Sequence, residues 1–190
     1  MKPTEPEPVK FFCGILYVQE IFLETAKNRL IKNYGPIDFQ SKAFPFDVTD
    51  YYVPEMGSPI FRVFVSFENW IHPKDLARIK LETNAIEEEL ASSGKRPINL
   101  DPGYMDVGKV VLASSKYNVQ KIYLDFGIYA DLTLYYEKGH FSPYPWSFPD
   151  FKTNRYERTF LLIHERFKVQ HKNWIRKRQK NSDKNKKLSE

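Results

Sequence analysis

Cysteine is almost absent from this chain, with one residue in 190, which excludes a disulfide framework and a zinc site built from several thiolates. That residue, Cys13, stands inside the apolar run 11–18, where we expect a buried and unreactive thiol. No apolar run reaches the roughly 18 residues that are needed to span a bilayer. The first ten residues are rich in Pro and Glu and do not resemble a secretory signal. We therefore expect a cytoplasmic protein without a membrane span.

The common signatures of nucleotide-binding and hydrolytic sites are missing as well. The sequence contains no G-x-x-x-x-G-K-[ST] loop, no G-x-G-x-x-G turn and no G-x-S-x-G elbow. His164-Glu165 begins like the helix motif of zinc proteases, but Lys168 occupies the position of the second histidine. The residue types required for these four kinds of site are therefore not present at the required spacing.

Aromatic side chains are abundant, and positive charge gathers at one end. Aromatic residues make up 16% of the chain and hydrophobic residues 42%, which is enough for a folded core. Residues 165–190 hold ten Lys or Arg and three acidic residues, and no hydrophobic residue follows Ile175 until Leu188. We predict one compact domain over 1–178 and a disordered basic tail over 179–190. The tail either binds nucleic acid or another anionic surface, or only keeps the protein soluble.

Hydrophobic periodicity predicts alternating strands and helices along the chain. The predicted elements are a strand at 11–18, a helix at 20–34, a strand at 37–46, an irregular loop at 48–58, a strand at 60–68, a helix from 73 to 90, a short strand at 98–100, a helix at 107–114, a hairpin at 121–136 and a long C-terminal helix from 156. Apart from the irregular loop, the first six of these elements follow the order β-α-β-β-α-β, which is typical of a ferredoxin-like unit. We predict an α+β fold with a ferredoxin-like start, extended by a further helix, a β-hairpin and a long C-terminal helix.

Two polar segments are candidates for a binding site. The segment F-P-F-D-V-T-D-Y-Y at 44–52, with E-M-G at 55–57, places carboxylates and phenols in a loop, where functional groups are common. Its candidates are Asp47, Asp50, Tyr51, Tyr52 and Glu55. Carboxylates of this kind can hold Mg²⁺ through oxygen ligands, or they can simply cap turns.

The second segment is N-L-D-P-G-Y at 99–104. Asp-Pro-Gly is a strong turn signal, and a turn between a strand and a helix directs backbone N–H groups at a bound anion. Asp101 can alternatively act as the cap of that helix. The candidates taken from this region are Asn99, Asp101, Tyr104 and Lys109, and Asp50 with Asp101 are the candidate metal ligands.

Two further segments combine polar and aromatic groups. Lys80, Thr83 and Asn84 share one face of the predicted helix, which indicates either a buried hydrogen-bond network or the wall of a pocket, and Lys80 and Asn84 join the candidates. The segment P-W-S-F-P-D-F at 145–151 holds three aromatic rings and three prolines with its flank, so it cannot form a central strand. It either covers the core or offers a stacking surface.

These segments together resemble a prokaryotic family of domains of unknown function. The resemblance rests on P-V-K-F-F-C-G-I-L-Y at 8–17, Y-G-P-I-D at 34–38, F-P-F-D-V-T-D-Y-Y, K-L-E-T-N at 80–84, N-L-D-P-G-Y, I-Y-L-D-F-G-I-Y-A-D-L-T-L at 122–134 and P-W-S-F-P-D-F. It covers about 8–157 and leaves the basic tail outside. The resemblance implies a single compact domain, and it supplies neither an activity nor a catalytic residue.

Three functions are consistent with these features. The first is a binding domain for a nucleotide or another phosphorylated small molecule, with the two polar segments forming its site. The second is a Mg²⁺-dependent hydrolase or phosphotransferase, in which clustered carboxylates hold the metal. Its carboxylates would be Asp47, Asp50, Glu55, Asp101 and Asp131. The third is an RNA-associated protein that is anchored by the basic tail. The sequence favours the first and leaves open whether the protein is an enzyme.

Overall fold

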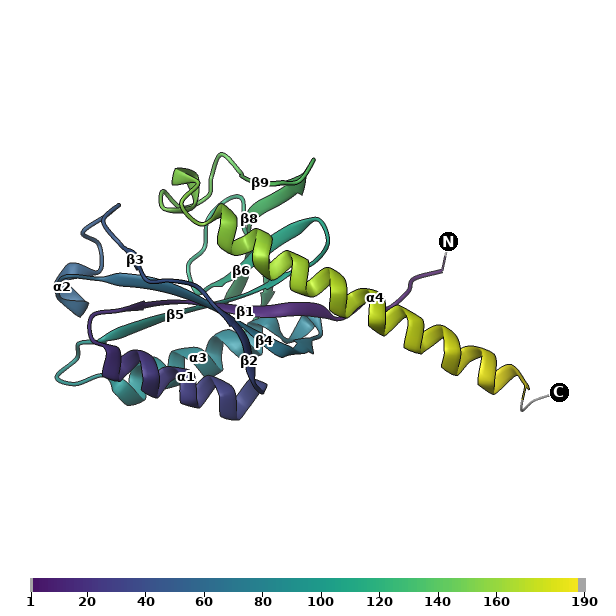
Figure 1. The fold of residues 1–190 in the computed structure, drawn as a ribbon. Helices are drawn as coiled ribbons and strands as arrows, with labels where there is room; N and C mark the ends of the chain where they lie inside the picture. Colours follow the sequence, from purple (N-terminus) through teal and green to yellow (C-terminus); the bar gives the residue numbers. More distant parts are fainter. Residues whose placement is uncertain (1, 188–190) are drawn as a thin grey trace.

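The computed structural model describes residues 2–187, and its centre is an antiparallel sheet (Figure 1). The strands are β1 (Val9–Tyr17), β2 (Ile37–Gln40), β3 (Phe44–Pro45), β4 (Phe61–Ile71), β5 (Ile98–Met105), β6 (Lys109–Ser114), β7 (Ile122–Asp125), β8 (Ile128–Glu137) and β9 (His140–Pro143). The helices are α1 (Glu20–Tyr34), α2 (Val53–Met56), α3 (Leu76–Leu90) and α4 (Glu157–Lys187), with short 3₁₀ turns at Pro73–Asp75 and Phe151–Thr153. The strand order is β2-β4-β1-β5-β6-β8-β7, with β3 added to β4 and β9 added to β8.

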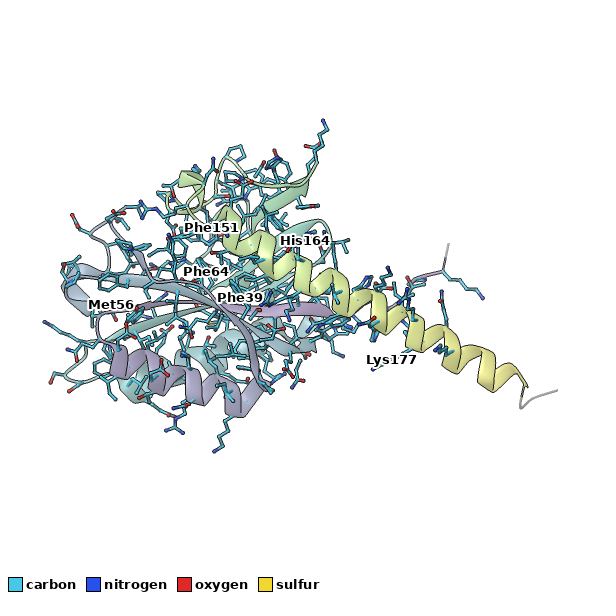
Figure 2. The ribbon with its side chains drawn as sticks, in the orientation of Figure 1. Phe39, Met56, Phe64, Phe151, His164 and Lys177 are labelled. Carbon is cyan, nitrogen blue, oxygen red and sulfur yellow. The ribbon has the colours of Figure 1, made fainter. Side chains whose placement is uncertain are left out.

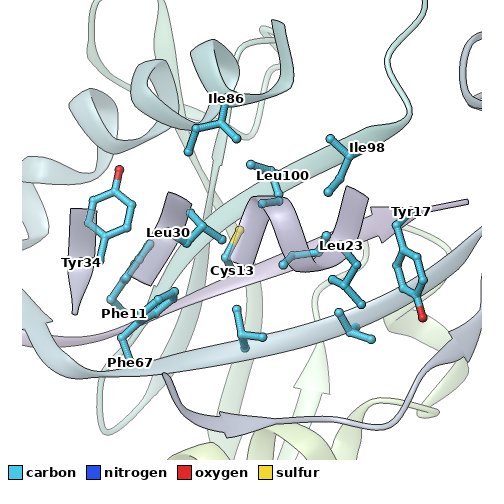
Figure 3. Close-up of a cluster of buried hydrophobic side chains, with 14 of the residues drawn as sticks. Phe11, Cys13, Tyr17, Leu23, Leu30, Tyr34, Phe67, Ile86, Ile98 and Leu100 are labelled. Carbon is cyan, nitrogen blue, oxygen red and sulfur yellow. The ribbon is translucent and has the colours of Figure 1, made fainter. Parts of the chain in front are cut away.

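The sheet is the middle of three layers, because helices cover both of its faces. In Figure 1, α1 and α3 lie on one face and α4 crosses the other. Every residue of β1 is buried, and its side chains alternate between the two cores. Phe11, Cys13 and Ile15 pack with α1 and α3, as Figure 3 shows for the first two. Phe12 faces the other way and packs with Phe160 of α4.

Several predictions from periodicity are confirmed. The α+β class is correct, helix α1 has the predicted bounds, and α3 and the β7–β8 hairpin lie where expected. Helix α1 ends at Gly35, whose φ of 92° suits glycine and whose N–H bonds the carbonyl of Ile31 at 2.9 Å. Cys13 is fully buried, and burial raises the pKa of its thiol, so the thiolate is disfavoured.

The predicted turn at Asp101-Pro102-Gly103 is wrong, because β5 continues through it to Met105. The N–H and C=O of Leu100 point away from β1, so the backbone nitrogen and the C=O of Pro102, two residues further, do so too. Pairing with β6 begins only at Gly103, so the missing N–H of proline removes no ladder bond. Gly103 is required by close approach rather than by a turn: a Cβ there would lie 2.6 Å from the carbonyl oxygen of Val111.

The helix predicted at 107–114 is also wrong, since Lys109–Ser114 is strand β6. Val110 and Leu112 pack on the α4 side of the sheet, whereas Val111 and Ala113 pack against the start of α3. A short apolar run that is buried on both faces fits a central strand as well as a helix, so its periodicity cannot distinguish them. The anion-binding turn at the start of this helix, which the sequence suggested, therefore does not exist.

Helix α4 begins as predicted and continues through residue 187. It thus enters the segment 179–190 that we predicted as a disordered tail; residues 188–190 lie outside the described residues, and the division into domain and tail stays a prediction. Lys10, fully buried on β1, joins the helix to the sheet: its ammonium donates to Gln170 at 2.9 Å, to the carbonyl of Phe67 at 2.7 Å and to Asp38. No helix within residues 2–187 is long and apolar enough to cross a membrane.

We predict that stability depends on His164 below neutral pH. His164 is buried on α4, and its Nε2 lies 3.2 Å from the carbonyl oxygen of Val107, so this nitrogen carries the proton of the neutral ring (Figure 2). Desolvation, followed by the charge of Lys168, lowers the pKa of His164 below its usual value near 6.5. The unfolded chain then binds a proton first, so stability present above about pH 6.5 is lost as the pH falls below it.

The measurement is the melting temperature from pH 7.5 to 5.5 for the wild type and for His164→Gln, in which the amide can still donate to Val107. The melting temperature of the wild type should fall by more degrees over this pH range than that of the variant. Equal losses in the two proteins would show that the pH dependence originates elsewhere.

Candidate functional site

The main cavity of the protein, about 640 Å³, lies where strands β5 and β6 separate. The two strands pair only between Gly103–Met105 and Val110–Leu112. Beyond this pairing, Asp101 of β5 and Ser114 of β6 line opposite sides of the opening. The loop before α2, the helix α3 and the segment at 148–151 close the remaining sides. The fork in the sheet therefore explains why a cavity exists at this place.

Two side chains of α3 complete the unpaired edge of β5 inside the fork. Glu87 accepts a hydrogen bond from the N–H of Leu100 at 2.6 Å, and Lys80 donates to the carbonyl of Leu100 at 2.6 Å. These contacts replace the neighbouring strand that β5 lacks here, and buried backbone groups require such partners. Burial raises the pKa of Glu87, with Lys80 opposing the shift. Lys80 thus lines the cavity, but its ammonium is committed to the backbone.

The floor of the cavity is a buried arginine between two aspartates. Arg62 of β4 lies 3.2 Å from Asp101 and 3.2 Å from Asp150, and its guanidinium is 5.0 Å from the ring centre of Phe46. Burial disfavours the charged guanidinium, but the two carboxylates outweigh this effect and raise the pKa of Arg62. Two buried atoms of this group have no hydrogen-bond partner within the described protein: the Nε of Arg62 donates no hydrogen bond, and the Oδ2 of Asp150 accepts none.

One wall is organised by a second arginine that the sequence analysis did not select. Arg96 binds both oxygens of Glu55, at 2.5 and 2.9 Å, and also binds Glu87 and the side-chain oxygen of Asn99. The amide of Asn99 in turn donates to Asp101 at 2.9 Å. The hydrogen bonds from Arg96 lower the pKa of Glu55 and keep it charged. Glu55 and Asn99 therefore hold the wall in place instead of facing the cavity.

The opposite wall carries a lysine next to a serine. Lys121 lies 3.3 Å from Asp131 of β8, donates to the hydroxyl of Ser114 at 2.8 Å and sits 5.6 Å from the ring centre of Phe148. Burial raises the pKa of Asp131, and Lys121 opposes that shift. This wall thus combines a cation, a hydroxyl and an aromatic ring.

The mouth is formed by Tyr51 and Lys116, two exposed residues from loops that are far apart in sequence. The Lys116 ammonium contacts the Tyr51 hydroxyl and lies 4.2 Å from the centre of its ring. Tyr51 packs edge-on against Tyr52, whose ring also meets Phe46 at 5.9 Å. Burial raises the pKa of Tyr52, so its hydroxyl remains protonated.

The structure brings together some of the predicted candidates and separates others. Tyr51, Tyr52, Lys80, Asn84 and Asp101 line the cavity. Six candidates lie outside its lining. Asp47 pairs with Arg155 at 2.8 Å, Asp50 does not reach the cavity, and Glu55 and Asn99 support its wall. Tyr104 and Lys109 line a smaller cavity of about 400 Å³ together with Asp106. The two polar segments thus meet at one place through Tyr51, Tyr52 and Asp101.

Four of the five carboxylates proposed as metal ligands are engaged by cations, and the exception is Asp50. Asp47 pairs with Arg155, Glu55 with Arg96 and Asp131 with Lys121, while Asp101 pairs with Arg62. Within residues 2–187, no three of the His, Cys, Asp and Glu side chains are arranged to hold a metal ion. The geometry therefore places ion pairs, rather than a carboxylate cluster, around the cavity.

Among the lining residues that sequence reasoning missed are Arg62, Arg96, Lys116, Lys121 and Asp150. Arg62 gave the one usable signal, because it alternates with Phe61 and Val63 in a strand that is buried on both faces. A charged residue at such a position must have partners in the interior. The other four lie in loops or at strand ends, where the sequence pattern does not indicate the direction of a side chain.

Comparison with known proteins identifies a family and nothing more specific. The model of one family, described as a domain of unknown function (DUF4416), matches residues 7–167. Comparisons with curated proteins and with solved structures gave no match. The match covers the sheet, α1, α3 and the first third of α4, and it includes all of the residues that line the main cavity.

Proposed function

This chain belongs to the DUF4416 family, and from its cavity we propose that it binds a small molecule with a flat ring and a phosphate group, such as a nucleotide. A volume of about 640 Å³ is in the usual range for a ligand pocket, roughly 300–1,000 Å³. Phe46, Tyr52, Phe148 and Phe151 supply aromatic surface in its lining. Rings of this kind accept a flat ligand by stacking.

The charge of the lining supports a phosphate at the mouth. Arg62, Lys80, Arg96 and Lys121 each face a carboxylate within 4 Å. Lys116 forms no ion pair with any described residue, and it stands at the mouth next to the hydroxyl-bearing Ser114 and Ser115. An ammonium without a carboxylate partner, next to serine hydroxyls, is a suitable partner for a phosphate.

Lys116 is the observation that carries this proposal. Its ammonium lies over the ring of Tyr51, and a cation–π contact at such an exposed site is weak. An incoming anion can therefore replace this contact or bind beside it. The ring of the ligand would then lie deeper, between the aromatic side chains, and its polar edge would meet the Arg62 and Asp150 floor. Binding requires no metal ion in this arrangement.

A thermal-shift panel of nucleotides and sugar phosphates tests the proposal. A ligand at 100 times its Kd stabilises the native state by about 2.7 kcal/mol, which raises the melting temperature of a chain of this length by about 5–10 °C. Lys116→Gln should remove most of that rise at the same ligand concentration, because a charge-assisted hydrogen bond contributes about 1.5–3 kcal/mol.

Lys138→Gln is the matched control, since Lys138 is exposed in the β8–β9 turn and has the same charge. It should keep the full shift. A panel without any shift, or equal shifts for the wild type and Lys116→Gln, would contradict the proposal.

We also propose that the first half of the chain is a ferredoxin-like unit. The order β2-β4-β1-β5 and the antiparallel pairing of each neighbouring pair support it, because a split β-α-β unit leaves one strand between the two that a helix connects. Helices α1 and α3 cover one face of these strands, as that unit requires.

A further inference from the structure

Helix α4 continues well beyond the body of the protein. Its first half is buried through Phe160, Ile163 and Phe167. Its last contacts with the body involve His171 and Trp174, which pack against Trp70 of β4. From residue 176 to 180 every side chain is exposed, and Figure 1 shows the distal half of the helix projecting past the sheet. Lys177 marks this projecting part in Figure 2.

The projecting part is strongly basic. Residues 172–187 hold eight Lys or Arg and one acidic residue, Asp183. The exposed basic residues of this part whose side chains are described are Lys172, Arg176, Lys177, Arg178 and Lys180. None of these five forms an ion pair within the described structure. A rod of unpaired positive charge attracts a polyanion, and the attraction is lost at high salt.

The composition of the helix favours nucleic acid over a membrane. A helix that lies on a bilayer needs an apolar face, and no hydrophobic residue occurs between Ile175 and Leu188. Nucleic acid requires only regularly spaced cations for its phosphates, with aromatic surfaces for its bases.

An aromatic platform stands at the base of the basic segment. His171 and Trp174 stack with ring centres 5.9 Å apart, and Trp70 lies 5.9 Å from Trp174. The guanidinium of Arg178 lies 4.6 Å from the centre of the Trp174 ring. Trp70 and Trp174 are only half-buried, so part of each indole is open to a base. Stacking on such rings tolerates every sequence, provided that the bases are not paired.

We propose that the distal part of α4 is a binding site for single-stranded nucleic acid, with its basic side chains on the phosphates and the Trp70–Trp174 platform under a base. The site is separate from the main cavity in position and in chemistry. It adds a second ligand to the protein and does not rest on the proposed function.

The experiment measures binding of the full chain to a fluorescent single-stranded RNA of about 12 nucleotides by anisotropy between 50 and 300 mM salt. The logarithm of the affinity should fall with that of the salt concentration, with a slope of about −0.7 per phosphate contacted. A fourfold variant combines Arg176→Gln, Lys177→Gln, Arg178→Gln and Lys180→Gln. It should reduce the magnitude of this slope by about 3 and keep the helix, since glutamine is a good helix former.

The matched control removes the same charge from the body, through Lys32→Gln, Lys42→Gln, Lys74→Gln and Lys138→Gln, all of which are exposed. It should keep the slope. Trp174→Ala should weaken binding about 5- to 100-fold without changing the slope, because stacking contributes no released counterion. Lys116→Gln should leave RNA binding unchanged, which separates this site from the cavity.

Three results would overturn the proposal. They are no binding at 50 mM salt, an equal loss of slope in the control variant, or binding to phosphatidylserine vesicles without binding to RNA. Tighter binding to duplex than to single-stranded RNA would overturn the role of the aromatic platform.

Discussion

Arg62→Met is expected to lower the melting temperature by about 10 °C. The side chain is buried between Asp101 and Asp150, at 3.2 Å from each, and removing it leaves two carboxylates without their cation. Breaking a buried ion pair from one side costs about 3–5 kcal/mol, since the remaining charge has lost its partner in a medium that does not solvate it. In a chain of this length each kcal/mol corresponds to about 2–4 °C.

The contribution of the ion pairs can be separated from that of packing by removing all three charges together. In Arg62→Met, Asp101→Asn, Asp150→Asn no unpaired charge remains, and replacing a whole buried ionic cluster is often close to neutral. The triple variant should therefore recover much of the loss, although Asp101→Asn also weakens the hydrogen bond from Asn99. A triple variant as unstable as Arg62→Met would show that the guanidinium acts through packing alone.

Gly103→Ala is expected to destabilise the protein by about 3 kcal/mol, at the upper end of the cost of overpacking. The added methyl group would lie 2.6 Å from the carbonyl oxygen of Val111, 2.7 Å from the ring of Phe12 and 2.9 Å from Leu112. The first of these is backbone of the paired strand β6 and cannot move without breaking the ladder. The fork between β5 and β6 begins at this residue, so the cavity should widen as well.

Gly108→Ala supplies the matched control, since its methyl group would meet only one atom within 4 Å, the Oδ1 of Asp106 at 3.9 Å. Its free energy of unfolding, measured by urea denaturation, should stay within about 0.5 kcal/mol of the wild-type value. If Gly103→Ala were equally stable, β5 and β6 would not approach as closely as described here.

The sequence predicted helices α1 and α3 correctly, but it gave wrong predictions for the end of strand β5 and for strand β6 at the centre of the sheet. Apolar residues at spacings of three and four define α1 and α3, and tertiary packing does not override that pattern. Asp101-Pro102-Gly103 has the composition of a turn, but long-range pairing with β1 keeps it extended. Which strand lies beside Pro102, and where its pairing stops, depends on topology and cannot be read from local composition.

The candidate site was found in part, for a similar reason. Tyr51, Tyr52 and Asp101 were selected from loops and turns, and the fold brings them to one cavity. The cations that complete the cavity, such as Lys116 and Lys121, carry no local signal, because a lysine in a loop is usually a solvated surface residue. Lys109 was selected for a turn that does not form, and it pairs with Asp106 elsewhere.

Isothermal titration of the full chain with the four ribonucleoside monophosphates and their nucleosides tests the central claim most directly. The cavity with Lys116 at its mouth predicts that at least one monophosphate binds with a stoichiometry of one, and that its nucleoside binds about 10- to 100-fold more weakly. In Lys116→Gln the two affinities should become nearly equal. Absence of binding by every monophosphate, or equal affinities of monophosphate and nucleoside for the wild type, would contradict the account.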